Sequence, residues 1–260
     1  MLISTINIEV VHMSNGIIFG NFIESENIST AWLNAVCTLR NNKNEAFGLA
    51  VKILNPTKID QQLTNELDNL ITKSGLQSLH TVSNTIFPQH LYRKSENYNE
   101  FFRRFNKIYL KIRKSPKNRS GTYFGRLTNW NNSNQDNDVI NQINKLLNKI
   151  NYRPFGLKSS YLANVFDPLR DQDKYYGFPC LSFIDFKLEP STNQLHLIAF
   201  YRNHRFWERA YGNYVGLGQL LEFMCTETNM ELGNLLVISS HAEIENHKKD
   251  IDYLINKYQS

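Results

Sequence analysis

The sequence has little cysteine, no long apolar run and no recognisable export signal. Its 260 residues include three cysteines, Cys37, Cys180 and Cys225, without a CxxC spacing, which argues against a disulfide scaffold or a zinc ribbon. No apolar run reaches the roughly 18 residues that a membrane span needs. The first residues lack a basic flank and a small-residue cleavage site. These absences predict a protein of the reducing cytoplasm, without a membrane anchor.

Neither the net charge nor the histidine spacing identifies a function by itself. A net charge of +5, from 29 basic and 24 acidic residues, suits a binder of phosphorylated small molecules but is too weak alone to indicate nucleic acid. The seven histidines show no HxxxH or HxH spacing, so no metal site is predicted. With 41% hydrophobic and 12% aromatic residues, the chain can bury a sizeable core.

Hydrophobic periodicity predicts an α/β or α+β domain in which the strands tend to be antiparallel. No segment has the composition of an interdomain linker, so residues 1–260 are expected to form a single domain. The predicted helices cover residues 31–39, after Ser29-Thr30 as the cap, and residues 60–71, 97–114, 139–150, 214–228 and 242–258. The predicted strands cover residues 46–54, 181–188, 194–201 and 235–238, and a polar surface loop is expected over 129–138.

Several motifs follow one another in a fixed order. They are Gly121-Thr122-Tyr123-Phe124-Gly125 with Trp130, then Phe166-Asp167-Pro168, Pro179-Cys180, Arg202-Asn203, Asn213, and Ala242-Glu243-Ile244-Glu245-Asn246-His247. In order and approximate spacing this set resembles the thymidylate synthase family, which includes the pyrimidine hydroxymethylases. The resemblance covers roughly residues 121–250, so residues 1–120 are the less family-like part.

The resemblance implies a thymidylate synthase-like sandwich, with a large mixed sheet and helices packed on one face. It also implies a homodimer through the other face, a pyrimidine nucleotide as substrate and 5,10-methylenetetrahydrofolate as cofactor. Cys180 would add to C6 of a uracil nucleotide, a role that suits a thiolate. Arg202 would bind the phosphate and lower the thiol pKa, and Asn213 would pair with O4 and N3–H of uracil.

Each of these residues also has a purely structural interpretation. A cysteine at the start of a strand is often a small apolar filler, and a strand-end arginine is often only solvated. Asn213 follows Gly212 and fits a helix cap as well as a base reader. Glu66 resembles a family glutamate that relays protons to the pyrimidine, but a helix glutamate commonly faces water.

Other positions are assigned by the resemblance alone. Asn203 takes the second place of the family's Arg-Ser pair, and Phe124 stands where the family has tyrosine. Glu243 and Glu245 stand where a histidine and a tyrosine hold the ribose 3′-hydroxyl. We therefore predict that Asn203, Phe124, Glu243 and Glu245 contact the substrate.

The sequence departs from the family in three further places. The paired arginines that reach the partner's phosphate fall on Ser159 and Ser160, with only Lys158 nearby, and the pterin-binding aspartate becomes Arg205. The family's C-terminal lid has no counterpart in the residues after His247. Folate-dependent methylation therefore requires a substitute lid, and the lost arginines require replacements, for which Arg153, Arg170 and Arg209 are candidates.

Three functions are compatible with these features. The first is transfer of a one-carbon unit to C5 of a pyrimidine nucleotide. The second is a non-catalytic relative that binds a nucleotide or a partner protein as a sensor or scaffold. The third is nucleic-acid binding through the basic run Arg103, Arg104, Lys107, Lys111, Arg113, Lys114, Lys117 and Arg119; the alternative for this run is an amphipathic helix with Phe101, Phe105, Ile108 and Ile112 facing the core.

Overall fold

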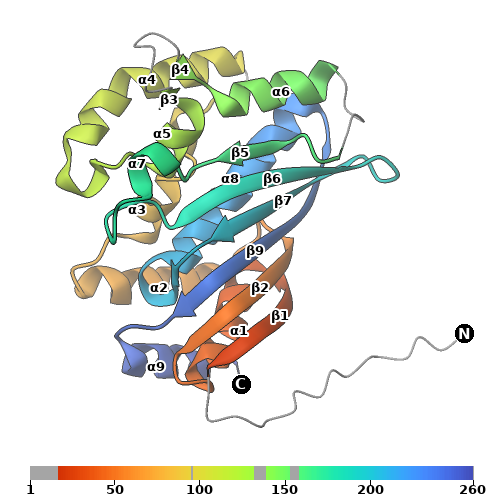
Figure 1. Cartoon of the computed structure of the whole chain (residues 1–260). Helices are drawn as coiled ribbons and strands as arrows, with labels where there is room; N and C mark the ends of the chain where they lie inside the picture. Colours follow the sequence, from red (N-terminus) through yellow and green to blue (C-terminus); the bar gives the residue numbers. More distant parts are fainter. Residues whose placement is uncertain (1–16, 95, 132–138, 153–157, 260) are drawn as a thin grey trace, which may run out of the picture.

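The computed structural model describes residues 17–94, 96–131, 139–152 and 158–259. Both helices and strands occur along the whole described chain, with helices following one another over residues 61–128 (Figure 1). The strands are β1 (Ile18–Asn27), β2 (Glu45–Asn55), β3 (Trp130–Asn131), β4 (Val139–Ile140), β5 (Leu162–Asn164), β6 (Leu181–Glu189), β7 (Gln194–Tyr201), β8 (His204–Arg205) and β9 (Glu231–Glu243).

The α-helices are α1 (Ile28–Arg40), α2 (Gln61–Lys73), α3 (Leu79–Asn84), α4 (Tyr98–Lys114), α5 (Tyr123–Thr128), α6 (Gln142–Tyr152), α7 (Pro168–Asp171), α8 (Tyr211–Thr228) and α9 (Lys248–Tyr258). Two 3-10 turns, η1 (Gln89–Leu91) and η2 (Pro116–Asn118), flank α4. A π-helical turn, η3 (Phe206–Ala210), leads directly into α8.

A seven-stranded mixed sheet forms the centre of the molecule, which confirms the predicted fold class. Its strand order is β1-β2-β9-β7-β6-β5, with β8 also paired to β9. The pairs β1/β2, β7/β9 and β8/β9 are parallel, whereas β2/β9, β5/β6 and β6/β7 are antiparallel. The expected antiparallel tendency therefore holds for half of the strand pairs in this sheet. The other pairs are parallel because the chain also returns to the sheet through crossover helices and not only through hairpins such as β6–β7.

Helices α1 and α8 pack against one face of the sheet and against each other, while the opposite face is open (Figure 1). The predicted amphipathic helix 97–114 is confirmed as α4, which Asn97 caps and which buries Phe101, Phe102, Phe105 and Tyr109. Phe101, Phe102 and Phe105 join Phe87, Phe124 and Phe223 in one aromatic cluster.

The close approach of α3 to α8 depends on glycine. A Cβ added at Gly212 would lie 2.7 Å from Cβ of Val82, and one at Gly216 would lie 2.7 Å from the carbonyl oxygen of Ser83. These two glycines therefore let α3 contact the α8 backbone directly, and this contact brings Val82 beside Asn213.

Several predicted boundaries are wrong. The helix predicted for 242–258 begins only at Lys248, because β9 continues to Glu243 by pairing with β2 and β8. In the helix predicted for 139–150, Val139 and Ile140 instead form β4 against β3. Part of the polar loop predicted for 129–138 lies outside the described residues. Strand β1 has no counterpart in the sequence-based prediction.

Candidate functional site

A break between two collinear strands places two predicted site residues at a cavity. β7 and β8 both pair with β9 in parallel and in the same register, and Arg202 and Asn203 form bends between them without pairing to β9. The backbone N–H of Arg202 still donates to the carbonyl of Cys180, at 2.9 Å. The predicted neighbours Cys180 and Arg202 are therefore next to each other in space.

The cavity has a volume of about 480 Å³ and opens to solvent. Segments far apart in the sequence form its walls: Gln77, Val82 and Thr85 in and around α3, the segment 118–123, the loop at 175–180, the segment 202–209 and the start of α8. Cys180, Arg202, Asn203 and Asn213 all line it. A volume of this size is in the range of small-molecule sites in proteins.

The Cys180 side chain is partly exposed at the cavity wall, at the start of β6. Burial raises the pKa of its thiol, and Arg202, Arg205 and Arg209 oppose that shift without cancelling it. The expected lowering by Arg202 is present, but desolvation is the larger effect. The thiol is therefore protonated in the ligand-free protein at neutral pH.

The guanidinium of Arg202 holds the loop that precedes Cys180. Its Nε donates to the carbonyl of Pro179 at 3.0 Å, and its Nη2 donates to the carbonyl of Phe178 at 3.1 Å. The same guanidinium lies 3.5 Å from the centre of the Phe178 ring. Within the described residues it forms no ion pair, so its charge is available to an anion in the cavity.

Two further arginines line the same cavity. Arg205 pairs with Glu245 at 2.8 Å and with Glu208 at 3.5 Å, whereas Nη1 of Arg209 donates to Oε1 of Gln77 at 2.5 Å. Of the arginines proposed to replace the lost pair, Arg209 reaches the cavity. Arg170 instead pairs with Asp167, and Arg153 lies outside the described residues.

Asn203 and the two predicted glutamates lie together beside the cavity. Nδ2 of Asn203 donates to Oε1 of Glu243 at 2.9 Å, which leaves Oδ1 of Asn203 buried without a partner in the described part of the chain. Burial raises the pKa of Glu245, with Arg205 opposing and Glu243 and Glu208 adding to the shift. Of these three residues only Asn203 lines the cavity, so the predicted substrate contacts of Glu243 and Glu245 are not placed there.

Asn213 is not a helix cap, and that interpretation is wrong. The N-cap position of α8 is Ala210, and Asn213 lies inside the first turn. Its Nδ2 is 3.1 Å from Nε2 of His204, and its Oδ1 is buried without a partner among the described residues. Because Asn213 lines the cavity, this unpartnered acceptor is suited to a ligand donor.

The structure does not bring Glu66 or Phe124 to the cavity. Glu66 on α2 accepts hydrogen bonds from Lys257, Tyr253 and Tyr258 at 2.6–2.9 Å, and these bonds lower its pKa to about 2. Phe124 is fully buried in the aromatic cluster. Glu66 therefore connects α2 to α9, and Phe124 packs the core.

Tyr123, one residue before Phe124, lines the cavity instead. Burial raises the pKa of its hydroxyl, and backbone hydrogen bonds from Leu181 and Cys180 oppose the shift. The sequence analysis missed this residue because α5 begins at Tyr123, and only the helix direction decides which of two adjacent aromatic side chains faces inward. The motif around Gly121 was the available signal.

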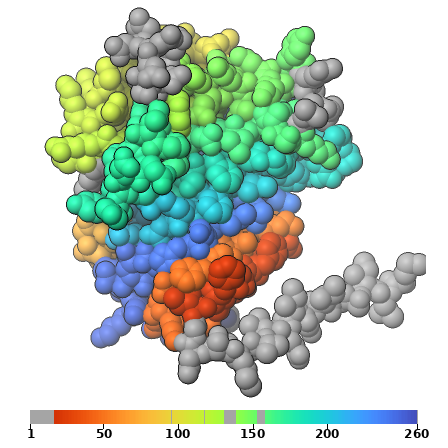
Figure 2. Space-filling model, in the orientation of Figure 1, coloured from red at the N-terminus to blue at the C-terminus, as the bar shows by residue number. Residues whose placement is uncertain are grey.

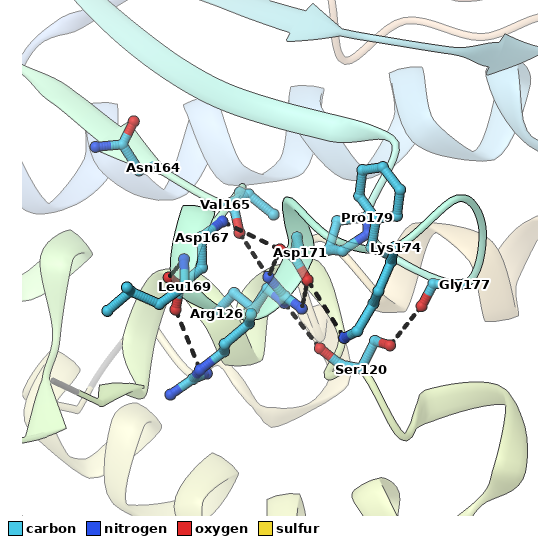
Figure 3. Close-up of polar contacts among 12 residues, drawn as sticks. Ser120, Arg126, Asn164, Val165, Asp167, Leu169, Asp171, Lys174, Gly177 and Pro179 are labelled. Atoms are coloured by element: carbon cyan, nitrogen blue, oxygen red, sulfur yellow. Dashed lines mark hydrogen bonds and ion pairs between the residues drawn. The ribbon is translucent and has the colours of Figure 1, made fainter. Parts of the chain in front are cut away.

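A buried ion pair that the sequence analysis also missed holds the cavity loops (Figure 3). Arg126 and Asp171 pair with side chains that are 3% and 0% exposed. Arg126 also donates to the carbonyls of Ser120 at 2.8 Å and Val165 at 3.0 Å, and Oγ of Ser120 donates to the carbonyl of Gly177 at 2.5 Å. Burial raises the pKa of Asp171, but hydrogen bonds from Arg126 and the Asp167 backbone outweigh it, so its pKa is lowered.

Two other kinds of site are not found in the described ranges. No group of three or more His, Cys, Asp or Glu side chains there is arranged to hold a metal ion. No helix in the same ranges is long and apolar enough to cross a membrane.

Sequence comparison identifies distant relatives of the chain. No protein-family model matches the chain. Three archaeal proteins named "Putative thymidylate synthase", from Methanosarcina acetivorans, Methanosarcina barkeri and Methanosarcina mazei, are each 28% identical to it over 130 residues. The chain has a distant thymidylate synthase-like relationship.

The similarity covers 50% of this chain and 55% of each of these relatives. The chain thus spans about half the length of the curated relatives it matches.

Proposed function

We propose that this protein is a thymidylate synthase-like transferase that acts at C5 of a uracil nucleotide through Cys180. The observation that carries this proposal is the position of the Cys180 thiol in an open cavity beside Arg202, with the unpartnered Oδ1 of Asn213 in the same cavity. Arg202 and Arg209 supply positive charge for a 5′-phosphate, and Asn213 accepts from the pyrimidine ring.

The chemistry that this arrangement supports begins with loss of the Cys180 thiol proton to solvent. The thiolate then forms a bond to C6, and the C5=C6 electron pair moves onto the C4 carbonyl oxygen as an enolate. The electron-rich C5 bonds to an electrophile and loses its original proton. Cleavage of the S–C6 bond restores the C5=C6 double bond and the thiolate.

The folate of the family supplies the one-carbon electrophile, and one position here does not fit it. The family's pterin-binding aspartate accepts hydrogen bonds, whereas Arg205 only donates and is already paired with Glu245 and Glu208. No step is therefore assigned to the cofactor. We propose the adduct at C6, and 5,10-methylenetetrahydrofolate is the one-carbon donor to test first.

The adduct is tested without any cofactor. Incubation of deoxyuridine monophosphate with the protein in deuterated water should replace the C5 hydrogen by deuterium, because the enolate takes up a deuteron before the S–C6 bond breaks. Loss of the H5 signal by NMR measures the exchange, and Cys180→Ser should abolish it. A wild-type protein that binds the nucleotide without exchange would contradict the proposal.

The one-carbon step is tested by trapping with a 5-fluoropyrimidine nucleotide. We expect intact-protein mass spectrometry to show an added mass that contains the nucleotide and the folate. An adduct with nucleotide alone would show that the donor is another compound, and Cys180→Ser is the control that removes either adduct.

A non-catalytic nucleotide binder is the second candidate, because the raised pKa of Cys180 leaves little thiolate at neutral pH. It predicts that the nucleotide raises the melting temperature while neither exchange nor an adduct appears.

A third candidate function, nucleic-acid binding, rests on α4, where Lys107, Lys111, Arg113 and Lys114 are exposed. It predicts oligonucleotide binding with a steep dependence on salt.

We also propose that a second copy of the chain covers the open face of the sheet. Strands β1, β2, β9 and β7 lie at the molecular surface on this face (Figure 2). Their half-buried or exposed apolar side chains include Phe22, Phe47, Ile198, Phe200, Leu236 and Ile238. The nearby charges are already paired within the chain, as Lys52–Glu24 at 2.7 Å and Lys187–Asp185 at 2.6 Å. An identical surface can therefore cover this face without supplying counter-charges.

Light scattering after size exclusion tests the dimer. We expect the wild type to have twice the chain mass, and Phe200→Glu to produce a monomer. Leu169→Glu, at a side chain that is 78% exposed on α7, is the control that should leave the mass unchanged. A monomeric wild type would overturn this proposal.

A further inference from the structure

Three buried polar side chains form a hydrogen-bonded chain beside the cavity. Oγ of Ser239 on β9 is 2.9 Å from Nδ1 of His204 on β8, and Nε2 of His204 is 3.1 Å from Nδ2 of Asn213 on α8. Their side chains belong to residues that are 0%, 1% and 2% exposed. Of these three residues, His204 and Asn213 line the cavity.

The imidazole of His204 is neutral. Burial lowers its pKa to about 3, and the ring stacks on Tyr201, with ring centres 4.1 Å apart and planes 1° from parallel. A neutral imidazole has one N–H and one acceptor nitrogen. Its two neighbours therefore determine which nitrogen carries the proton.

The amide nitrogen of Asn213 can only donate. Since it faces Nε2 of His204, Nε2 is the acceptor, and the proton lies on Nδ1 and is donated to Ser239. The other end of the carboxamide, Oδ1, then points away from His204 and has no partner within the described residues.

We propose that His204 is a positioning residue that turns the Asn213 carboxamide with its oxygen toward the cavity, so that the cavity selects a ring edge bearing an N–H. This inference rests on the proposed function. Uracil has a hydrogen at N3, whereas N3 of cytosine is an acceptor, and two facing acceptors repel each other. His204 thereby acts on base selection without touching the base.

The opposite tautomer predicts the opposite preference. A proton on Nε2 would bind Oδ1 of Asn213, and the carboxamide would present its nitrogen to the cavity. That arrangement matches the cytosine edge. The position of one buried proton therefore sets the base preference, and this position is measurable.

Long-range proton–nitrogen NMR of the wild-type protein identifies the tautomer directly. We expect the His204 resonances to show a protonated Nδ1 and an unprotonated Nε2. A protonated Nε2 would overturn the proposal. This measurement needs no ligand, so its outcome does not depend on whether the protein binds a nucleotide.

Binding of deoxyuridine and deoxycytidine monophosphates provides the second test. We expect the wild type to prefer the uracil nucleotide, and His204→Leu to reduce that preference at least about tenfold, because the free carboxamide can then turn. His204→Gln keeps an acceptor and should retain much of the preference. Ser240→Ala, an exposed neighbour on β9, should not alter it.

An unchanged preference in a folded His204→Leu protein, together with an unchanged preference in the control, would show that His204 only packs the core. A wild type that binds neither nucleotide would instead overturn the proposed function, and with it the base selection. Should His204→Leu fail to fold, the tautomer measurement still decides the matter.

Discussion

Two clusters of buried polar groups, one around Arg126 and one on the cavity wall at Asn203 and Asn213, are built in opposite ways. Around Arg126 the guanidinium is satisfied by Asp171, Ser120 and Val165. On the cavity wall, Oδ1 of Asn203 and Oδ1 of Asn213 have no partner within the described residues. Buried polar groups are normally paired, so the first cluster stabilises the fold and the second is suited to a ligand.

The two clusters are connected through one loop of the cavity wall. The loop at 175–180 carries part of the cavity wall. Arg126 holds it through Ser120, whose Oγ donates to the carbonyl of Gly177 (Figure 3), and Arg202 holds it from the cavity side. Arg126 acts on the site only through this loop, whereas Arg202 also faces the cavity. Substitutions in the two clusters should therefore affect different properties.

The largest effect is expected at the ion pair. Arg126→Met should lower the free energy of unfolding by about 3–5 kcal/mol, because it leaves the buried carboxylate of Asp171 without its partner. Denaturant unfolding measures this change. The double variant Arg126→Met with Asp171→Leu should recover much of the loss, and Lys174→Ala, an exposed partner of the same carboxylate, should change stability by less than about 1 kcal/mol.

At the cavity the expected pattern is reversed. Arg209→Met should weaken binding of a uracil nucleotide about tenfold, with little change in unfolding, because its guanidinium faces the cavity without an ion pair in the described part of the chain. Isothermal titration measures the affinity. Arg205→Met should have a smaller effect, since Glu245 and Glu208 already neutralise Arg205. Equal losses for nucleotide and nucleoside would argue against a phosphate role.

Thiol reactivity gives a third contrast. Since burial raises the pKa of Cys180, iodoacetamide should modify it several-fold more slowly than a free cysteine at neutral pH, and the rate should keep rising above the pH at which free cysteine levels off. Peptide mass spectrometry follows the modification of Cys180 alone. A fast reaction at neutral pH would mean that the arginines outweigh desolvation.

The smallest effect is expected at Glu66, which lies in neither cluster. Glu66→Gln should cost less than about 1 kcal/mol, as for other partly exposed ion pairs. The carboxyl pKa falls from 4.5 to about 2 in the folded protein, so its contribution is complete above about pH 4.5 and disappears as the pH falls toward 2. Acid unfolding of wild type and variant should therefore converge below this range.

Local patterns predicted much of the secondary structure. The strands around Val51 and Leu197 and the helix around Phe105 follow directly from alternating or helical spacing of apolar residues. The boundary near Ala242 could not be predicted in this way. Strand β9 extends to Glu243 because β2 and β8 supply hydrogen-bond partners on both sides, and those partners come from distant parts of the chain.

The site shows the same division. Cys180, Arg202 and Asn213 were predicted from their order in the sequence, and the structure brings them to one cavity. Tyr123 lies in the motif around Gly121 but was not predicted, because that motif does not show which of two adjacent aromatic side chains faces inward. His204 was not predicted, because nothing in the local sequence indicates that it faces this cavity.

The sequence alone determined which chemical groups are present and the order in which they occur, since a thiol, guanidinium or carboxamide is a property of the residue. Tertiary structure decided which of them are open to a ligand. Arg126 and Arg202 are the same residue type, yet burial against Asp171 neutralises one, while a break between β7 and β8 turns the other toward the cavity. The reason is physical, because desolvation and hydrogen-bond pairing depend on neighbours that only folding brings together.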